Sequence, residues 1–242
     1  MANLNDYHNA SSGRCFMVGN GPSLLEQLHL LPLLKDETTF CCNSIGEWDE
    51  LPFEPTYYGV TDLSDYKWLE RNRFPHWKKT LRFNVQFVDW PEHPDFQTVQ
   101  KAPDNVQVYP YGTVGMDETL PPIPTARTTP LTLGQLALWM GHRELFYIGI
   151  EQTRGYAYDV NATMSMTGRH AFPLDKNPKY QTAIQRNAAQ MRKDIEAHGG
   201  RIVDCTPGGL LNVTGKDIPR RNVPWRDVLP YESLESVLGV KV

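Results

Sequence analysis

The sequence predicts an α/β protein with a Rossmann-like, mostly parallel sheet and helices on both faces. Short runs rich in β-branched and aromatic residues alternate along the chain with stretches of helical periodicity, a pattern typical of parallel sheets. In addition, the apolar run at 14–19 leads directly into the segment GNGPS at 19–23. A tight strand-to-helix turn of this kind is typical of nucleotide-binding folds.

Seven segments are predicted as strands from their apolar and β-branched residues: 14–19, 38–43, 56–61, 81–88, 106–110, 144–150 and 201–205. Two longer helices are predicted from three-to-four spacing of apolar residues. In the first, at 131–140, the apolar residues share one face and Gly141 ends the helix. The second spans 180–198 and ends at Gly199-Gly200, so both lie between predicted strands.

The length and composition fit one domain spanning residues 1–242. The chain has 242 residues, of which 40% are hydrophobic, enough for a sizeable core. The net charge of −4 argues against a nucleic-acid partner. No stretch approaches the roughly 20 apolar residues of a membrane span. The polar start lacks the apolar core of a signal peptide, and together these features predict a cytoplasmic protein.

The four cysteines show no metal-binding spacing. Cys15, Cys41 and Cys205 lie in predicted strands, and Cys42 follows Cys41 directly. Buried thiols in a reducing compartment are the favoured interpretation, with disulfides as the alternative.

The glycine turn favours an anion such as a nucleotide phosphate. Glycines let the backbone approach a ligand closely, and a helix start presents unpaired N–H groups. A side chain at Gly21 is therefore expected to block a ligand without disturbing the fold. Two departures argue against NAD: Leu24 stands where a third glycine is required, and Asn43 stands near the expected acidic ribose ligand. The alternative to a ligand site is a tight connection with a purely structural role.

Four segments, in order, resemble a known superfamily: GNGPSL at 19–24, CCNS at 41–44, GQLALWMGHRELFYIGIE at 134–151 and HGGRIVDCTPGGLL at 198–211. The chain is similar over most of residues 14–211 to the bacterial CMP-sialic-acid-dependent sialyltransferases. The same superfamily contains 6-hydroxymethylpterin diphosphokinase-like proteins, many of which are described as glycosyltransferases. The resemblance implies a Rossmann-like nucleotide-binding fold and a transferase that uses a nucleotide-activated donor, a CMP-sugar-like or other nucleoside di- or triphosphate compound.

The resemblance also implies a set of site residues. Contacts to the nucleotide are implied for Gly19, Asn20, Gly21, Ser23, Asn43, Thr128 and Thr129. Arg127 and Tyr156 are implied to stabilise the leaving phosphate, and His170 corresponds to the catalytic histidine. Pro130 and Leu131 replace the Ser-Gly of the sialyltransferases, so a CMP donor is not defined by the sequence.

The residue types support this chemistry and leave alternatives open. A histidine near neutral pH suits the removal of a proton from an acceptor hydroxyl, and Tyr or Arg suits the departing phosphate. His170 is alternatively an exposed loop histidine. In TDLSD at 61–65, Asp62 could hold Mg²⁺ against phosphate oxygens, or Asp65 could cap the helix that follows.

A glycosyltransferase that moves a sugar to a small-molecule or glycan acceptor is the favoured function. The alternatives are a Mg²⁺-dependent pyrophosphokinase acting on a pterin-like alcohol and a non-catalytic nucleotide-binding module. Residues 152–178 carry polar and aromatic residues with little periodicity, and are predicted as a lid-like loop region. A homo-oligomer is compatible with the sequence, which does not define the oligomeric state.

Overall fold

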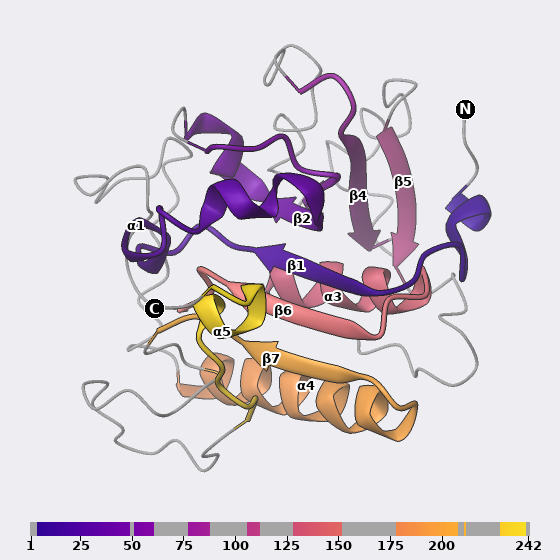
Figure 1. Ribbon diagram of the computed structural model, residues 1–242. Coiled ribbons are helices and arrows are strands. Elements are labelled where there is room, and N and C mark those ends of the chain that lie inside the picture. The colour runs from indigo at the N-terminus through magenta and orange to yellow at the C-terminus, as the bar shows by residue number, and fades with distance from the viewer. Residues whose placement is uncertain are drawn as a thin grey trace.

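The computed structural model describes residues 4–48, 51–60, 77–87, 106–111, 128–151, 178–207, 211 and 228–240. Their centre is an open sheet of seven strands, all paired in parallel (Figure 1). The strands are β1 (Arg14–Val18), β2 (Thr38–Cys42), β3 (Tyr57–Val60), β4 (Leu81–Phe87), β5 (Val106–Tyr111), β6 (Glu144–Ile148) and β7 (Arg201–Asp204). All seven predicted strands are confirmed, with ends shifted by at most two residues.

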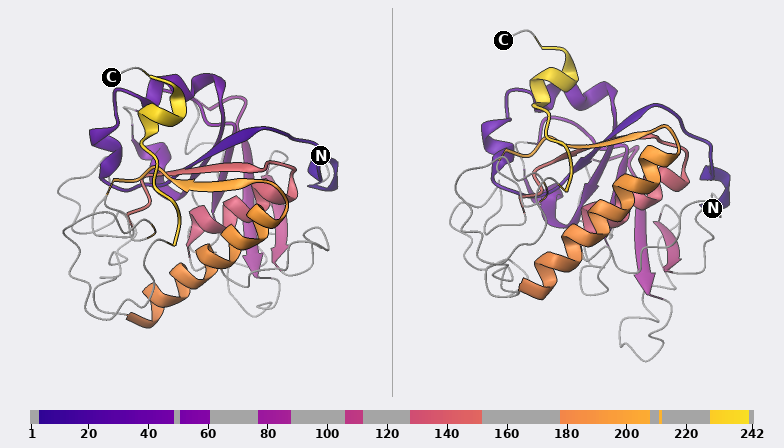
Figure 2. Two further views of the ribbon diagram at one scale, coloured as in Figure 1. Left: turned by 60° about the horizontal axis from the view of Figure 1, so that its bottom comes forward. Right: turned by 90° about the horizontal axis from the view of Figure 1, so that it is seen from below.

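Helices cover both faces of the sheet, as predicted. The α-helices are α1 (Ser23–Glu26), α3 (Thr129–Trp139), α4 (Pro178–Ala197) and α5 (Leu234–Leu238), and the 3₁₀ helices are η1 (Leu4–Tyr7), η2 (Leu31–Asp36) and η3 (Asn43–Glu47). Helices α3 and α4 lie on one face, and α1, η2 and α5 lie on the other (Figures 1 and 2).

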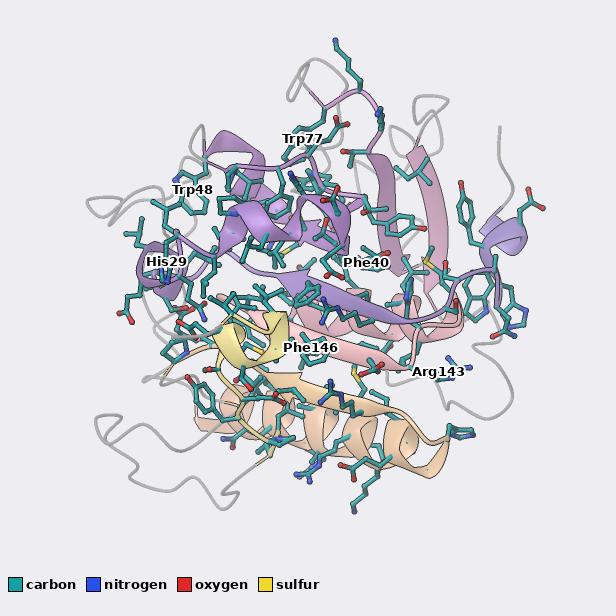
Figure 3. All side chains as sticks on the ribbon, in the orientation of Figure 1. His29, Phe40, Trp48, Trp77, Arg143 and Phe146 are labelled. Carbon is teal, nitrogen blue, oxygen red and sulfur yellow. The ribbon has the colours of Figure 1, made fainter. Side chains whose placement is uncertain are left out.

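The side chains of the strands alternate between two hydrophobic cores. In β1, Cys15 and Met17 belong to the core under α3 and α4, whereas Phe16 and Val18 belong to the core under α1, η2 and α5. Phe40 belongs to the core under α3 and α4, and Phe146 belongs to the core under α1, η2 and α5; both are labelled in Figure 3. Both faces of β1, β2, β3, β6 and β7 are therefore largely buried, which explains the nearly continuous apolar sequences of these strands.

The strand order β5-β4-β3-β2-β1-β6-β7 contains one reversal. From β1 the chain builds outward through β2 to β5, and then returns to place β6 against the other edge of β1. In open α/β sheets, ligands bind outside the carboxyl ends of the strands at such a topological switch point. The topology thus predicts a ligand site among the residues that follow β1, β2 and β6.

Helix α3 differs from its prediction in both start and exposure. It begins at Thr129 because Pro130 is accommodated in the first turn, where its missing N–H costs little. All eleven of its residues are buried, including the polar residues Thr129, Thr132 and Gln135, so it has no exposed face. A mostly apolar helix without an exposed face is typical of a buried position, and α3 indeed contacts the sheet and α4.

The N-terminal segment closes the other end of α3. The Asn9 amide donates to the Trp139 carbonyl at 3.1 Å, and the Ser11 amide donates to the Met140 carbonyl at 2.8 Å. The His8 ring stacks on the Trp139 ring with centroids 4.9 Å apart. The two hydrogen bonds satisfy the carbonyl groups of Trp139 and Met140, which the end of the helix leaves without intrahelical partners.

Several smaller elements were not predicted. The 3₁₀ helices and α5 are too short for a periodic pattern. The helix predicted directly after the glycine turn is confirmed as α1, which is a single turn of four residues. All four cysteines are buried and none forms a disulfide, which confirms the favoured interpretation of buried thiols. Within the described ranges, no helix is long and apolar enough to cross a membrane.

Candidate functional site

The turn after β1 is bonded to the end of β6. The Gly19 amide donates to the Ile148 carbonyl and the Gly21 amide donates to the Gly149 carbonyl, each at 2.8 Å. A Cβ atom added to Gly21 would coincide with the carboxylate of Glu151. Glycine is thus required at position 21 because the backbone there lies against Gly149 and Glu151 of the same chain. The expectation that a side chain at Gly21 leaves the fold undisturbed is wrong for this steric reason.

Gly149, directly after β6, is a second position at which the close packing requires glycine. Its φ of +65° lies in the left-handed region, and an added Cβ would lie 2.6 Å from the Leu24 side chain. Leu24 is fully buried in the same place. The residue that replaces the third glycine of a dinucleotide fingerprint therefore fills the space between α1 and the β6 turn.

Glu151 anchors the start of α1. One oxygen of its carboxylate accepts a hydrogen bond from the Ser23 amide. The side chain is 6% exposed, and its other oxygen has no hydrogen-bond partner among the described residues. Burial raises the pKa of Glu151, while its contacts with Ser23 lower it and leave a net increase. The structure thus holds a nearly buried carboxyl at the switch point.

Gln27 and Thr206 extend this network to the end of β7. The Gln27 side-chain amide donates to the Cys205 carbonyl at 2.8 Å. The Thr206 hydroxyl accepts from the Ile150 amide at 3.2 Å, and the Thr206 amide donates to the Asp204 carboxylate at 2.9 Å. The carboxyl ends of β1, β6 and β7 are consequently fixed relative to one another.

Asn20 and Asn43 each carry a side-chain oxygen that has no partner in the described part of the chain. Asn20 follows β1, and its side-chain amide points to the Cys42 sulfur at 4.0 Å. Asn43 follows β2 with a φ of +52°, and its carbonyl accepts from the buried Tyr58 hydroxyl. The side-chain oxygens of both asparagines are buried and have no hydrogen-bond partner among the described residues. Two adjacent strands thus each present an available acceptor.

Thr128 and Thr129 lie at the same edge of the sheet. Helix α3 runs back along the sheet to the start of β6, so its first residues lie near the carboxyl ends of the strands. Thr129 is 7% exposed, and the Thr128 carbonyl accepts from both the amide and the hydroxyl of Thr132 at 3.1 Å. The topology therefore brings these two predicted site residues to the edge that carries Asn20 and Asn43.

The remaining predicted site residues, Arg127, Tyr156, His170 and Asp62, lie outside the described residues, as does the predicted lid up to residue 177. Pro178, the last residue assigned to the lid, instead begins α4. The described part of the chain contains no group of three metal-ligating side chains.

Two further histidines have structural positions. His198 Nδ1 donates to the Asp194 carbonyl at 2.6 Å in the last turn of α4, as suits a helix end. His142 is buried; its Nδ1 lies 3.3 Å from the Gly13 carbonyl, and burial lowers its pKa.

Sequence reasoning missed Glu151, Gln27 and Thr206. The detectable signal was polarity in an apolar setting: Glu151 follows an apolar strand, and Gln27 lies in a leucine-rich segment. Their partners come from distant parts of the chain and could not be identified from spacing.

Gly21→Ala is expected to lower the free energy of unfolding by roughly 3 kcal/mol, because the added carbon displaces the buried Glu151 carboxylate. Gly199→Ala is the control. Gly199 has a φ of +73° and no neighbour within 4 Å of an added Cβ, so its substitution should cost only about 1 kcal/mol of backbone strain. Urea denaturation measures both, and equal losses would contradict the steric role of Gly21.

Glu151→Gln is expected to raise stability above that of the wild type at pH 8. The raised pKa means that the folded protein favours the protonated carboxyl, so ionisation above the usual pKa of 4.5 disfavours folding. The advantage of the neutral amide should shrink as the pH is lowered toward 4.5. Thermal unfolding across this range tests this, with Asp36→Asn at the exposed end of η2 as the control. A pH-independent difference would refute it.

Comparisons with known proteins were made over the whole chain. No protein-family model matches it, and no curated protein sequence matches it. One solved structure similar to this chain is the sialyltransferase CstII from Campylobacter jejuni, in complex with a substrate analogue, cytidine-5′-monophosphate. It is 14% identical, the match covers 88% of this chain and 87% of that chain, and the TM-score is 0.49. A likeness at this level does not define the family to which the chain belongs.

Proposed function

We propose that this protein is a transferase that uses a nucleotide-activated donor, with sugar transfer to an acceptor hydroxyl as the favoured reaction. The observation that carries the proposal is the pair of available acceptors, Asn20 Oδ1 and Asn43 Oδ1, beside the topological switch point. Buried polar atoms normally have partners, so a pair of oxygens at the expected ligand edge that has none among the described residues supports a ligand that bonds to them.

A nucleoside suits these acceptors. The 2′ and 3′ hydroxyls of ribose and the amino groups of bases are hydrogen-bond donors, and a carboxamide oxygen accepts from either. The backbone of Asn43 adopts a left-handed conformation that is sparsely populated for residues other than glycine. The hydrogen bond from the Tyr58 hydroxyl to the Asn43 carbonyl helps to maintain it. Backbone outliers that the surrounding structure maintains cluster at ligand sites.

The catalytic part of the proposal rests on the resemblance of the sequence motifs. His170 would take the proton from the acceptor hydroxyl as its oxygen bonds to the sugar carbon. The bond from that carbon to the phosphate oxygen would break, and the nucleotide would leave with the electron pair. Arg127 and Tyr156 would stabilise its charge, and Thr128 and Thr129 would contact the nucleotide from the start of α3.

Nucleotide binding is tested by a thermal-shift screen with CMP, UDP, GDP and ATP, followed by calorimetry on the best ligand. Asn43→Ala should weaken that ligand about three- to tenfold, the effect of one hydrogen bond. Asn9→Ala is a matched control, because Asn9 has nearly the same φ of +51° and lies on the N-terminal segment. The proposal fails if no nucleotide binds, or if both substitutions have equal effects.

Catalysis is tested by comparing His170→Ala with Asp62→Ala on one active donor–acceptor pair. His170→Ala should reduce turnover by about 10²–10⁴-fold and leave donor affinity nearly unchanged, because a general base acts on the acceptor. If the protein is a Mg²⁺-dependent pyrophosphokinase, Asp62→Ala should be the inactive variant and His170→Ala a mild one. Tight nucleotide binding without turnover of any donor would instead favour the non-catalytic alternative.

A further inference from the structure

The backbone N–H groups of Gly19, Gly21 and Ser23 in the glycine turn donate to acceptors within the protein. The bonds run from Gly19 to Ile148, from Gly21 to Gly149, from Ser23 to the Glu151 side chain, from Leu24 to Gly21 and from Leu25 to Pro22. Pro22 has no N–H group. A phosphate cradle requires donors that point away from the chain. The residues from Gly21 to Leu25 therefore offer a phosphate no unpaired amide.

The carboxylate of Glu151 occupies the place that an anion would take. In nucleotide-binding folds, the first amides after β1 and the helix dipole attract a ligand phosphate. Here the Ser23 amide already donates to a carboxylate of the protein. Glu151 is 6% exposed and follows β6, whose register with β1 is fixed by strand pairing. A ligand phosphate could reach the Ser23 amide only by displacing the buried Glu151 side chain.

We propose that Glu151 is a specificity-determining residue that excludes phosphate from the start of α1. This inference deepens the proposed function and rests on it for its biological meaning. A nucleotide would then present its nucleoside to Asn20 and Asn43, and its phosphate would lie away from the glycine turn. In this arrangement Gly19, Gly21 and Ser23 shape the site, and Asn20 and Asn43 contact the nucleoside.

The test follows the Ser23 amide by ¹H–¹⁵N NMR during titration with pyrophosphate. The wild type should show no change at this amide. Glu151→Ala removes the carboxyl group and frees the Ser23 N–H, so the Ser23 amide should shift saturably and pyrophosphate should bind about tenfold more tightly or better. Asp36→Ala is the control, because it removes an exposed carboxylate from the end of η2 and should behave like the wild type.

A saturable shift of the Ser23 amide in the wild type would overturn the proposal. So would a folded Glu151→Ala variant whose Ser23 amide does not respond. A second measurement needs no variant: each nucleoside is compared with its 5′-monophosphate on the wild type, and the added phosphate should leave the Ser23 amide unchanged. A phosphate-dependent shift there overturns the proposal. If no nucleoside or nucleotide binds, the proposed function fails, whereas the pyrophosphate titrations still decide the role of Glu151.

Discussion

The contact between the turn after β1 and the end of β6 is the constraint on which the rest of the site depends. Two backbone hydrogen bonds and the bond from the Ser23 amide to Glu151 join these segments. The approach is so close that Gly21 cannot carry a side chain in this arrangement. Because β1 and β6 are neighbours only through the reversal of strand order, one contact both closes the switch point and fixes the position of Asn20.

This constraint divides the glycine turn into two kinds of residue. Gly19, Gly21 and Ser23 have their amides directed into the protein, where burial makes each bond necessary. Asn20 lies between them with a side-chain oxygen that lacks a partner among the described residues. The structural role of the turn is thus carried by Gly19, Gly21 and Ser23, whereas the proposed ligand contact falls to Asn20 in the same motif.

The sequence predicted the sheet well because a strand buried on both faces leaves a local signature of apolar and β-branched residues. The segment at 14–19 illustrates this, since all but the first residue of β1 is buried. It predicted α3 less well, because exposure depends on what packs around a helix and not on the helix itself. The role of Glu151 could not be predicted, since its partner Ser23 lies 128 positions earlier in the chain. Spacing rules describe neighbours along the chain, whereas this site is made by strand order.

The position of β1 inside a wholly parallel sheet has a consequence for how the chain assembles. One edge of β1 pairs with β2, which follows soon after it, whereas the other edge pairs with β6, where Arg14 lies opposite Glu144. During synthesis from the N-terminus, β1 therefore remains exposed along one edge until most of the chain has been made. Such unpaired edges are where association with other chains begins, and sequence-distant pairings slow folding. The nascent chain is thus most vulnerable to aggregation before residues 144–148 emerge.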